Sequence, residues 1–229
     1  MKDNQTFIAN PDKNVLVIAI TGGIGSGKSE IGKILSEKGF PVISTDELAK
    51  SIMVGDTKVK LSLIDEFGQE VYDTSGKLNS KLLSEIVFKD DKYRQQRLDK
   101  LNSIVHPPVI DLMVTAIEDL ILKGHQLIFV ESALIYEAGL DNGFDYVICV
   151  SAEDEIRINR TIQRNNLCKE DVMARMGQQL SQELKISHAD FNIVNNKSLK
   201  DLKDSVDFLL PILQTLPPKN IYSSEETGS

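Results

Sequence analysis

The sequence predicts an α/β fold built on a doubly wound parallel sheet. Apolar runs of strand length alternate along the chain with amphipathic segments of helical period. The runs are continuous, as is typical of parallel strands buried on both faces. A glycine-rich turn joins the first run to the helix that follows it, and this connection is typical of the same fold class.

Strands are predicted where apolar residues run without a break. We expect them at residues 15–20, 40–43, 127–130, 146–150 and 191–194. Helices are predicted between and after the strands, the clearest at residues 153–165, 170–184 and 199–213. The first helix follows the glycine-rich turn and ends at Gly39, because glycine commonly follows a last helical turn.

The alternation is interrupted by a long stretch with helical periodicity almost throughout, so we expect a helical insertion in the sheet domain. The predicted domains are a sheet core of residues 14–55, 124–152 and 186–216, an insertion of 56–123 and a second helical segment of 153–185. Residues 1–13 form a polar N-terminal extension, and the polar composition of 217–229 predicts a disordered tail.

Composition is that of a soluble enzyme with one sizeable core. The chain has 229 residues, of which 41% are hydrophobic and 26% charged, and its net charge of −8 argues against a nucleic-acid partner. No window approaches the apolar length of a membrane span, so no membrane partner is expected. Cys149 and Cys168 lack metal or redox spacing, which suggests a reducing compartment. We therefore expect a cytoplasmic protein; its oligomeric state is not predicted.

Residues Gly22 to Ser29 read G-G-I-G-S-G-K-S, the P-loop motif, and they stand after a strand and at a helix start as the motif requires. Its glycines let successive N–H groups point at an anion, and the positive end of the helix points to the same place. Lys28 adds a positive charge for the outer phosphates, and Ser29 offers a hydroxyl to Mg²⁺. The sequence therefore predicts a P-loop NTPase-type fold. The residues expected to bind the nucleotide are Gly23, Ile24, Gly25, Ser26, Gly27, Lys28 and Ser29.

Two acidic residues follow strands and are expected near the same edge of the sheet, where ligands of such folds bind. Asp46 is a candidate base for a phosphoryl-transfer reaction, because a carboxylate must accept the proton of the attacking hydroxyl. Ser44 and Glu47 have capping-box spacing, so a helix-start role for Asp46 is equally compatible with the sequence. Glu131 ends a strand as a Mg²⁺-organising acid does, and a solvated strand-end glutamate is the alternative.

Arg157, Arg160 and Arg164 share one face of a predicted helix. Such a stripe can close over a triphosphate as a lid. The alternative is a solvated face, and for Arg157 we favour an exposed ion pair with Glu153. His106, in the helical insertion, would carry little weight by itself.

Further motifs follow the P-loop in a fixed order. They are Asp46, His106-Pro107, the segment 131–137 (E-S-A-L-I-Y-E), Arg160 with Arg164, the segment 175–179 (R-M-G-Q-Q) and the segment 189–196 (A-D-F-N-I-V-N-N). From about Val15 to Leu213 this ordered set resembles the dephospho-CoA kinases, P-loop kinases related to the nucleoside monophosphate kinases. The P-loop alone would not select this family.

The resemblance implies transfer of the γ-phosphate of ATP, with Mg²⁺, to the ribose 3′-hydroxyl of dephospho-CoA, the last step of coenzyme A synthesis. It implies that the helical insertion binds the acceptor and that residues 153–185, here called the lid segment, cover ATP. The implied catalytic residues are Asp46, Lys28, Arg160 and Arg164, with further ATP contacts from Arg164 and Asn195, acceptor contacts from Asp46, His106 and Glu137, and Mg²⁺ contacts from Ser29 and Glu131.

The chain departs from the family pattern at several positions. Ser44 stands where an aspartate is common, Ala133 where proline is usual and Glu131 where aspartate is usual. Arg157 occupies a position commonly held by glutamine.

Two other functions remain open at this point. A regulatory GTPase shares the P-loop but needs an N-K-x-D motif, and the segment 196–199 (N-K-S-L) lacks the aspartate. A kinase for another small acceptor, such as a nucleoside monophosphate, would share the whole architecture.

Overall fold

The computed structural model describes residues 15–89, 91–165 and 167–219. The chain forms two compact units, Ser44–Ala116 and a second unit made of Met1–Ile43 and Ile117–Ser229. The expected N-terminal extension, 1–13, lies outside the described residues, and so do residues 220–229 of the expected disordered tail.

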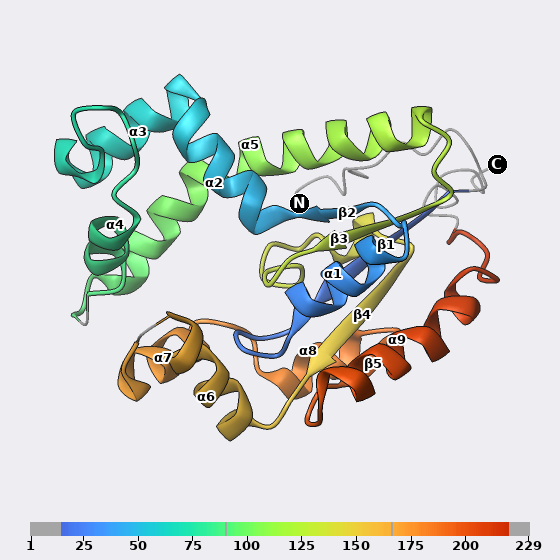
Figure 1. Cartoon of the computed structure of the whole chain (residues 1–229). Coiled ribbons are helices and arrows are strands. Elements are labelled where there is room, and N and C mark those ends of the chain that lie inside the picture. The colour runs from blue at the N-terminus through green and yellow to red at the C-terminus, as the bar shows by residue number, and fades with distance from the viewer. Residues whose placement is uncertain (1–14, 90, 166, 220–229) are drawn as a thin grey trace, which may run out of the picture. The chain divides into compact units, whose positions relative to one another are not determined.

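A five-stranded sheet with the order β2-β3-β1-β4-β5 forms the centre of the second unit (Figure 1). Its strands are β1 (Leu16–Thr21), β2 (Val42–Ser44), β3 (Leu127–Glu131), β4 (Tyr146–Ser151) and β5 (Phe191–Val194). β1 pairs in parallel with β3 and β4, and β4 pairs in parallel with β5. The predicted α/β fold with a parallel sheet is thus confirmed, although β2 begins at Val42 rather than at Phe40.

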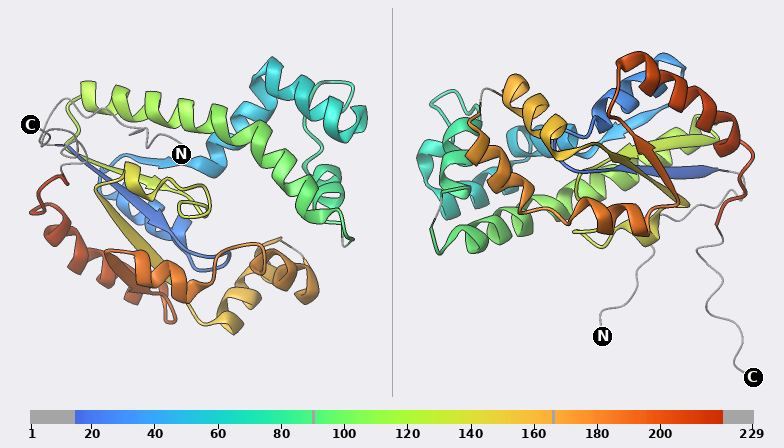
Figure 2. Two further views of the ribbon diagram at one scale, coloured as in Figure 1. Left: turned by 180° about the vertical axis from the view of Figure 1, so that it is seen from behind. Right: turned by 90° about the horizontal axis from the view of Figure 1, so that it is seen from below.

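Helices lie on both faces of this sheet (Figure 2). α1 (Lys28–Glu37) and α9 (Leu199–Leu213) cover one face, and α8 (Gln182–His188) lies on the other. Ile18 and Ile20 of β1 share a buried cluster with Ile31 of α1 and Leu202 of α9. The apolar stripes of both helices therefore face the sheet, as their sequences predict.

Two aspartates hold the starts of neighbouring strands in register. Val17 N–H donates to Asp145 Oδ2 at 2.8 Å, and the backbone N–H of Asp145 donates to Val17 O at 2.9 Å. Asp190 repeats the arrangement one strand further, with its Oδ2 accepting from Val147 N at 2.8 Å and its N–H donating to Val147 O at 3.0 Å. Each carboxylate thus satisfies a backbone N–H near the start of the neighbouring strand, and each strand begins opposite the third residue of that neighbour.

The lid segment contains α6 (Asp154–Asn165) and α7 (Lys169–Met176), and α8 follows after a turn. The expected single helix over 170–184 is wrong, because the chain leaves the helical path at Gly177 and begins again at Gln182. Ser181 is the N-cap of α8, and its side chain accepts a hydrogen bond from Leu184 N. This cap supplies the acceptor that a new helix start requires.

The unit Ser44–Ala116 is helical, as expected of the insertion. It contains α2 (Thr45–Gly55), α3 (Thr57–Phe67), the short helix η1 (Gln69–Val71) and α4 (Ser80–Val87), and α5 (Arg94–Leu122) begins in it. Leu63, Val71 and Val87 are fully buried in its own apolar cluster. The unit starts before the expected residue 56 because α2 packs with α3.

Within the described part of the chain, no helix has both the length and the apolar character needed to cross a bilayer.

Candidate active site

The P-loop, Gly22 to Ser29, follows β1, and α1 begins within it at Lys28. Ser26 N–H donates to Gly23 O at 3.1 Å, and Lys28 Nζ approaches the same oxygen at 3.4 Å. Lys28 is only 9% exposed although it carries a charge. The loop therefore curls around its own lysine at the N-terminus of a helix, an arrangement suited to anions.

The P-loop packs directly on the backbone of α6. Gly25 has φ 76°, and a Cβ added to it would overlap Arg157 O and lie 2.7 Å from Thr161 Oγ1. A Cβ on Gly23 would overlap the Arg157 guanidinium. These glycines thus permit the close approach of the lid segment as well as the turn of the loop.

Arg157 is buried, with its side chain only 6% exposed, so the favoured exposed ion pair with Glu153 is wrong. Its Nε donates to Ile24 O at 3.1 Å, and one terminal nitrogen donates to Asp154 Oδ1 at 2.8 Å. The physical reason is the shape of the P-loop: Gly23 leaves space that the guanidinium fills, and Gly25 lets the backbone of Arg157 approach.

Ile24 was expected to bind the nucleotide together with the rest of the P-loop. In the structure its N–H donates to Gln179 Oε1 at 2.8 Å. Gln179 belongs to the 175–179 motif noted in the sequence, but no role was predicted for this glutamine.

Asn195, just after β5, joins three elements and is 6% exposed. Its side-chain Nδ2 donates to Ser26 O at 2.8 Å, and its backbone carbonyl accepts from Arg160 Nη1 at 2.9 Å. The P-loop, β5 and α6 are therefore linked through one residue. Gly27 lies against the same amide, so a Cβ there would overlap Asn195 Nδ2.

A hollow opens beside these contacts. Arg164 lies on its rim with an exposed side chain that donates to Asn165 Oδ1 at 3.4 Å. The residues lining the hollow are Gly25, Gly27, Glu30, Arg160, Thr161, Arg164, Asn195, Leu199 and Leu202. The structure thus brings together P-loop glycines, Arg160, Arg164 and Asn195, as the sequence predicted.

Glu131 ends β3 and is 8% exposed, so the alternative of a solvated glutamate is wrong. Its Oε1 accepts a hydrogen bond of 2.7 Å from Ser29 Oγ. Both predicted metal-ligating side chains therefore meet at the carboxyl ends of β1 and β3. Among the described residues, no group of three or more His, Cys, Asp or Glu side chains has the arrangement of a metal site.

Glu137 lies in the loop after β3 and forms an ion pair with Lys185, a side chain with no exposed surface. Lys185 Nζ donates to Glu137 Oε1 at 2.7 Å and to Ala133 O at 2.6 Å, and Leu180 N donates to the same carboxylate oxygen at 3.0 Å. This pair was not predicted, because a lysine in a short helix usually faces solvent.

Two weak acids near this loop stay protonated at neutral pH. Burial raises the pKa of Cys149 to about 11, against a smaller opposing effect from Lys185. Burial also raises the pKa of Tyr136 well above its usual value. Neither group can therefore serve as a base or nucleophile near pH 7.

Asp46 and His106 belong to the helical unit. Asp46 is exposed in the first turn of α2, and the expected capping box is not formed because Ser44 makes no side-chain cap hydrogen bond. His106 is half-buried in α5, directly before Pro107. Burial lowers its pKa, so the imidazole is neutral at pH 7.

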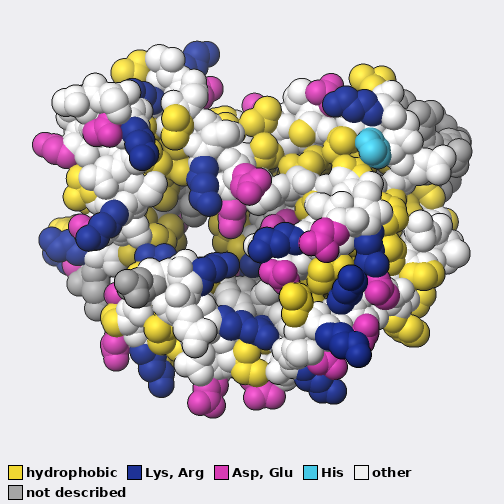
Figure 3. Space-filling model, in the orientation of Figure 1, with side chains coloured by type: hydrophobic (Ala, Val, Ile, Leu, Met, Phe, Trp, Pro, Cys, Tyr) yellow, Lys and Arg dark blue, Asp and Glu magenta, His cyan; other side chains and the backbone are white. Residues whose placement is uncertain are grey.

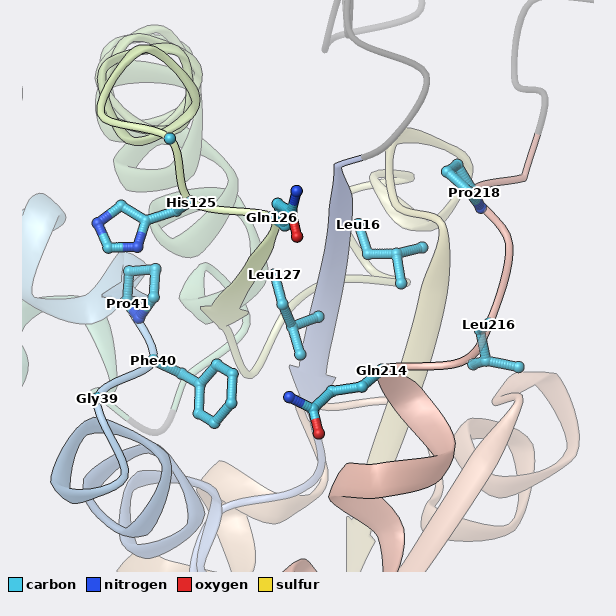
Figure 4. A pocket seen from close by; sticks show the side chains of 11 residues that line it. Leu16, Gly39, Phe40, Pro41, His125, Gln126, Leu127, Gln214, Leu216 and Pro218 are labelled. Atoms are coloured by element: carbon cyan, nitrogen blue, oxygen red, sulfur yellow. The ribbon is translucent and has the colours of Figure 1, made fainter.

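A separate pocket lies at the opposite edge of the sheet (Figure 4). Leu16 and Leu127, the first residues of β1 and β3, line it together with Phe40, His125 and Gln214. Ligands of doubly wound sheets bind beyond the carboxyl ends of the strands. The hollow beside the P-loop is therefore the better candidate for the nucleotide site.

The face of the molecule seen in Figure 3 has no large patch of one charge sign. Lys and Arg side chains lie among Asp and Glu side chains over this face, although the net charge is −8. Attraction of anions is thus a local property of the P-loop and the α6 arginines.

Comparison with known proteins agrees with this geometry. A family model described as dephospho-CoA kinase matches residues 16–201. A dephospho-CoA kinase of Fusobacterium nucleatum is 36% identical over 194 residues, which cover 85% of this chain and 96% of the relative. Another, of Listeria monocytogenes serotype 4b, is 34% identical over 189 residues, covering 82% of this chain and 92% of the relative.

Solved structures show the same relation. A crystal structure of a Thermus thermophilus protein has a TM-score of 0.70 and 32% identity, and the match covers 88% of this chain and 99% of that one. A dephospho-CoA kinase from Campylobacter jejuni has a TM-score of 0.63 and 26% identity, with 86% and 96% coverage.

The packing of the P-loop on α6 predicts unequal effects of alanine at two glycines with positive φ. Gly39→Ala meets nothing within 4 Å and should cost about 1–2 kcal/mol of unfolding free energy, the strain of a left-handed residue. Gly25→Ala carries the same strain and must also push α6 away, so its loss should be larger by at least about 2 kcal/mol. Urea unfolding measures both, and equal losses would contradict the close packing.

Proposed function

The chain belongs to the dephospho-CoA kinase family, and on that premise we propose how its residues perform the reaction. The chain is a kinase that phosphorylates the ribose 3′-hydroxyl of dephospho-CoA with ATP, giving coenzyme A and ADP in the final step of coenzyme A biosynthesis. The single observation that supports the catalytic assignment best is the P-loop, whose Lys28 lies at the start of α1 beside the Ser29–Glu131 pair.

The P-loop and α6 are proposed to hold the phosphates of ATP. Lys28, whose Nζ lies 3.4 Å from Gly23 O in the P-loop, is proposed to follow the transferring phosphate. Arg160 and Arg164 line the adjacent hollow and neutralise charge that develops during transfer. Asn195 also lines the hollow, and its hydrogen bond to Ser26 O holds the P-loop in place there.

Mg²⁺ is proposed to bind at Ser29 and Glu131. The two side chains supply a hydroxyl and a carboxylate oxygen 2.7 Å apart, and hard oxygen donors are what Mg²⁺ prefers. Few protein ligands are needed, because Mg²⁺ keeps waters and binds the substrate phosphates. When bound, the ion neutralises the charge on the β- and γ-phosphates.

Asp46 is proposed as the base that accepts the proton of the acceptor hydroxyl. Two observations support that role: Asp46 is exposed, and it follows the carboxyl end of β2, where ligands of such sheets bind. His106 and Glu137 are proposed acceptor contacts. Oε1 of Glu137 accepts from Lys185 and Leu180, and Oε2 is buried with no hydrogen-bond partner among the described residues.

The cytoplasm is the proposed location. Cys149 and Cys168 are both free in the structure, which supports a reducing compartment.

A panel of acceptors tests the proposed function. With Mg²⁺-ATP the purified chain should phosphorylate dephospho-CoA, whereas AMP and adenosine should have kcat/KM values lower by about a hundredfold or more, because they lack the arm whose binding orients the hydroxyl. ADP release measured by a coupled assay gives the rates. Efficient phosphorylation of AMP with none of dephospho-CoA would instead favour a nucleoside monophosphate kinase.

Asp46→Asn separates chemistry from helix stability. Asparagine keeps the shape of the side chain but cannot accept the proton, so kcat should fall by about a hundredfold or more. The free energy of unfolding should change by less than about 0.5 kcal/mol, as at other exposed positions. Glu47→Gln, in the same exposed turn, is the matched control and should keep kcat. A stable Asp46→Asn enzyme with normal turnover would remove Asp46 from the mechanism.

A further inference from the structure

Both backbone groups of Ile24, in the middle of the P-loop, are bonded to side chains of the lid segment. Its N–H donates to Gln179 Oε1 at 2.8 Å, and its carbonyl accepts from Arg157 Nε at 3.1 Å. Arg157 lies in α6 and Gln179 in the turn after α7, so the two bonds come from opposite ends of the lid segment.

Both side chains come from segments that have further contacts. Arg157 is also held by Asp154 Oδ1 at 2.8 Å. The backbone next to Gln179 is held at Leu180, whose N–H donates to Glu137 Oε1, and that carboxylate is paired with the buried Lys185. Because these contacts hold the segments that carry both side chains, the side chains can impose an orientation on Ile24.

A trans peptide is planar, so fixing one of its polar groups points the other in the opposite direction. Ile24 N–H shares its peptide with Gly23 C=O, and the bond to Gln179 therefore directs that carbonyl away from the lid segment. Gly23 O accepts from Ser26 N at 3.1 Å and lies 3.4 Å from Lys28 Nζ. Gln179 thus determines the direction of the Gly23 carbonyl, which lies against the amino group of Lys28.

The next peptide is oriented by Arg157. Ile24 C=O shares its peptide with Gly25 N–H, so the bond from Arg157 Nε points that N–H to the opposite side. The guanidinium itself is not available as a phosphate ligand, because its side chain is only 6% exposed and lies against Gly23, Ile24 and Asp154.

From these contacts we propose that Gln179 and Arg157 are positioning residues of the nucleotide site, which orient two successive P-loop peptides through Ile24. Gln179 places Lys28, and Arg157 places the N–H of Gly25. The inference rests on the proposed function only in that the oriented groups are taken to face nucleotide phosphates. It makes the shape of the P-loop dependent on the lid segment.

Amide hydrogen exchange tests the contact independently of activity. Gln179→Met removes the acceptor while keeping the length of the side chain, and exchange at Ile24 should become about tenfold faster or more, with β1 amides unchanged. Gln179→Glu retains an acceptor oxygen and should stay within about threefold of the original protein. Unchanged exchange at Ile24 in Gln179→Met overturns the proposal.

A double-mutant cycle on ADP affinity tests the shared action. Gln179→Met and Arg157→Met should each raise the Kd for ADP about tenfold, and the double variant should raise it by clearly less than the product, because both act on the same loop. Asp154→Asn keeps an oxygen that accepts from Arg157 and removes only the charge, so both Ile24 bonds remain and the Kd should stay within about twofold.

The possible failures are distinguishable. An effect of the double variant equal to the product, or an Asp154→Asn loss as large as that of Arg157→Met, overturns the positioning role. If Arg157→Met does not fold, the Gln179 variants decide by exchange and ADP affinity. If the unsubstituted protein fails to bind ADP, the proposed function is overturned. The exchange rate at Ile24 still tests the positioning role, because it does not depend on ADP binding.

Discussion

The backbone of α6 lies against the P-loop with no room for a side chain at Gly25, and the proposed nucleotide site depends on this contact. The strand order places it there. β4 lies beside β1, so the helix that follows β4 starts next to the loop that follows β1. β5 is the next strand, and Asn195 at its end reaches Ser26 O from the other side. Three strands that are neighbours in the sheet, β1, β4 and β5, are thus followed by the P-loop, by α6 and by Asn195, respectively.

The same contact explains why a chain of net charge −8 can bind a polyanion. Acidic residues elsewhere affect the site little, because exposed charges further away than about 10 Å are screened by salt. Near the loop, Lys28 is 9% exposed and Arg157 5%, so these charges lie in surroundings where electrostatic interactions are stronger than in water. Arg157 uses its charge to hold backbone, which leaves Arg160 and Arg164 for the hollow.

Local pattern predicted most of the fold and part of the site. The P-loop, the strand-end position of Glu131 and the bounds of α9 follow from runs of residues that determine their own structure. The misses are long-range. Gln179 is 155 residues from Ile24, and Lys185 is 52 residues from Ala133, so no periodicity reports these bonds. Arg157 was misjudged because a neighbouring acid suggested a surface pair, while the space left by glycines in a distant loop decided its burial. The split between α7 and α8 is the exception, a local miss: an apolar stripe continues through it, while Ser181 caps a new helix.

The central claim is that nucleotide phosphates bind where the P-loop meets α6. An amide NMR titration of the purified chain with Mg²⁺-ADP tests it most directly. Shifts should concentrate at residues 25–29, at Arg160 and Arg164, and at Asn195, which line or adjoin the hollow. Shifts confined to the pocket at the opposite edge of the sheet, around Phe40, His125 and Gln214, would contradict the account.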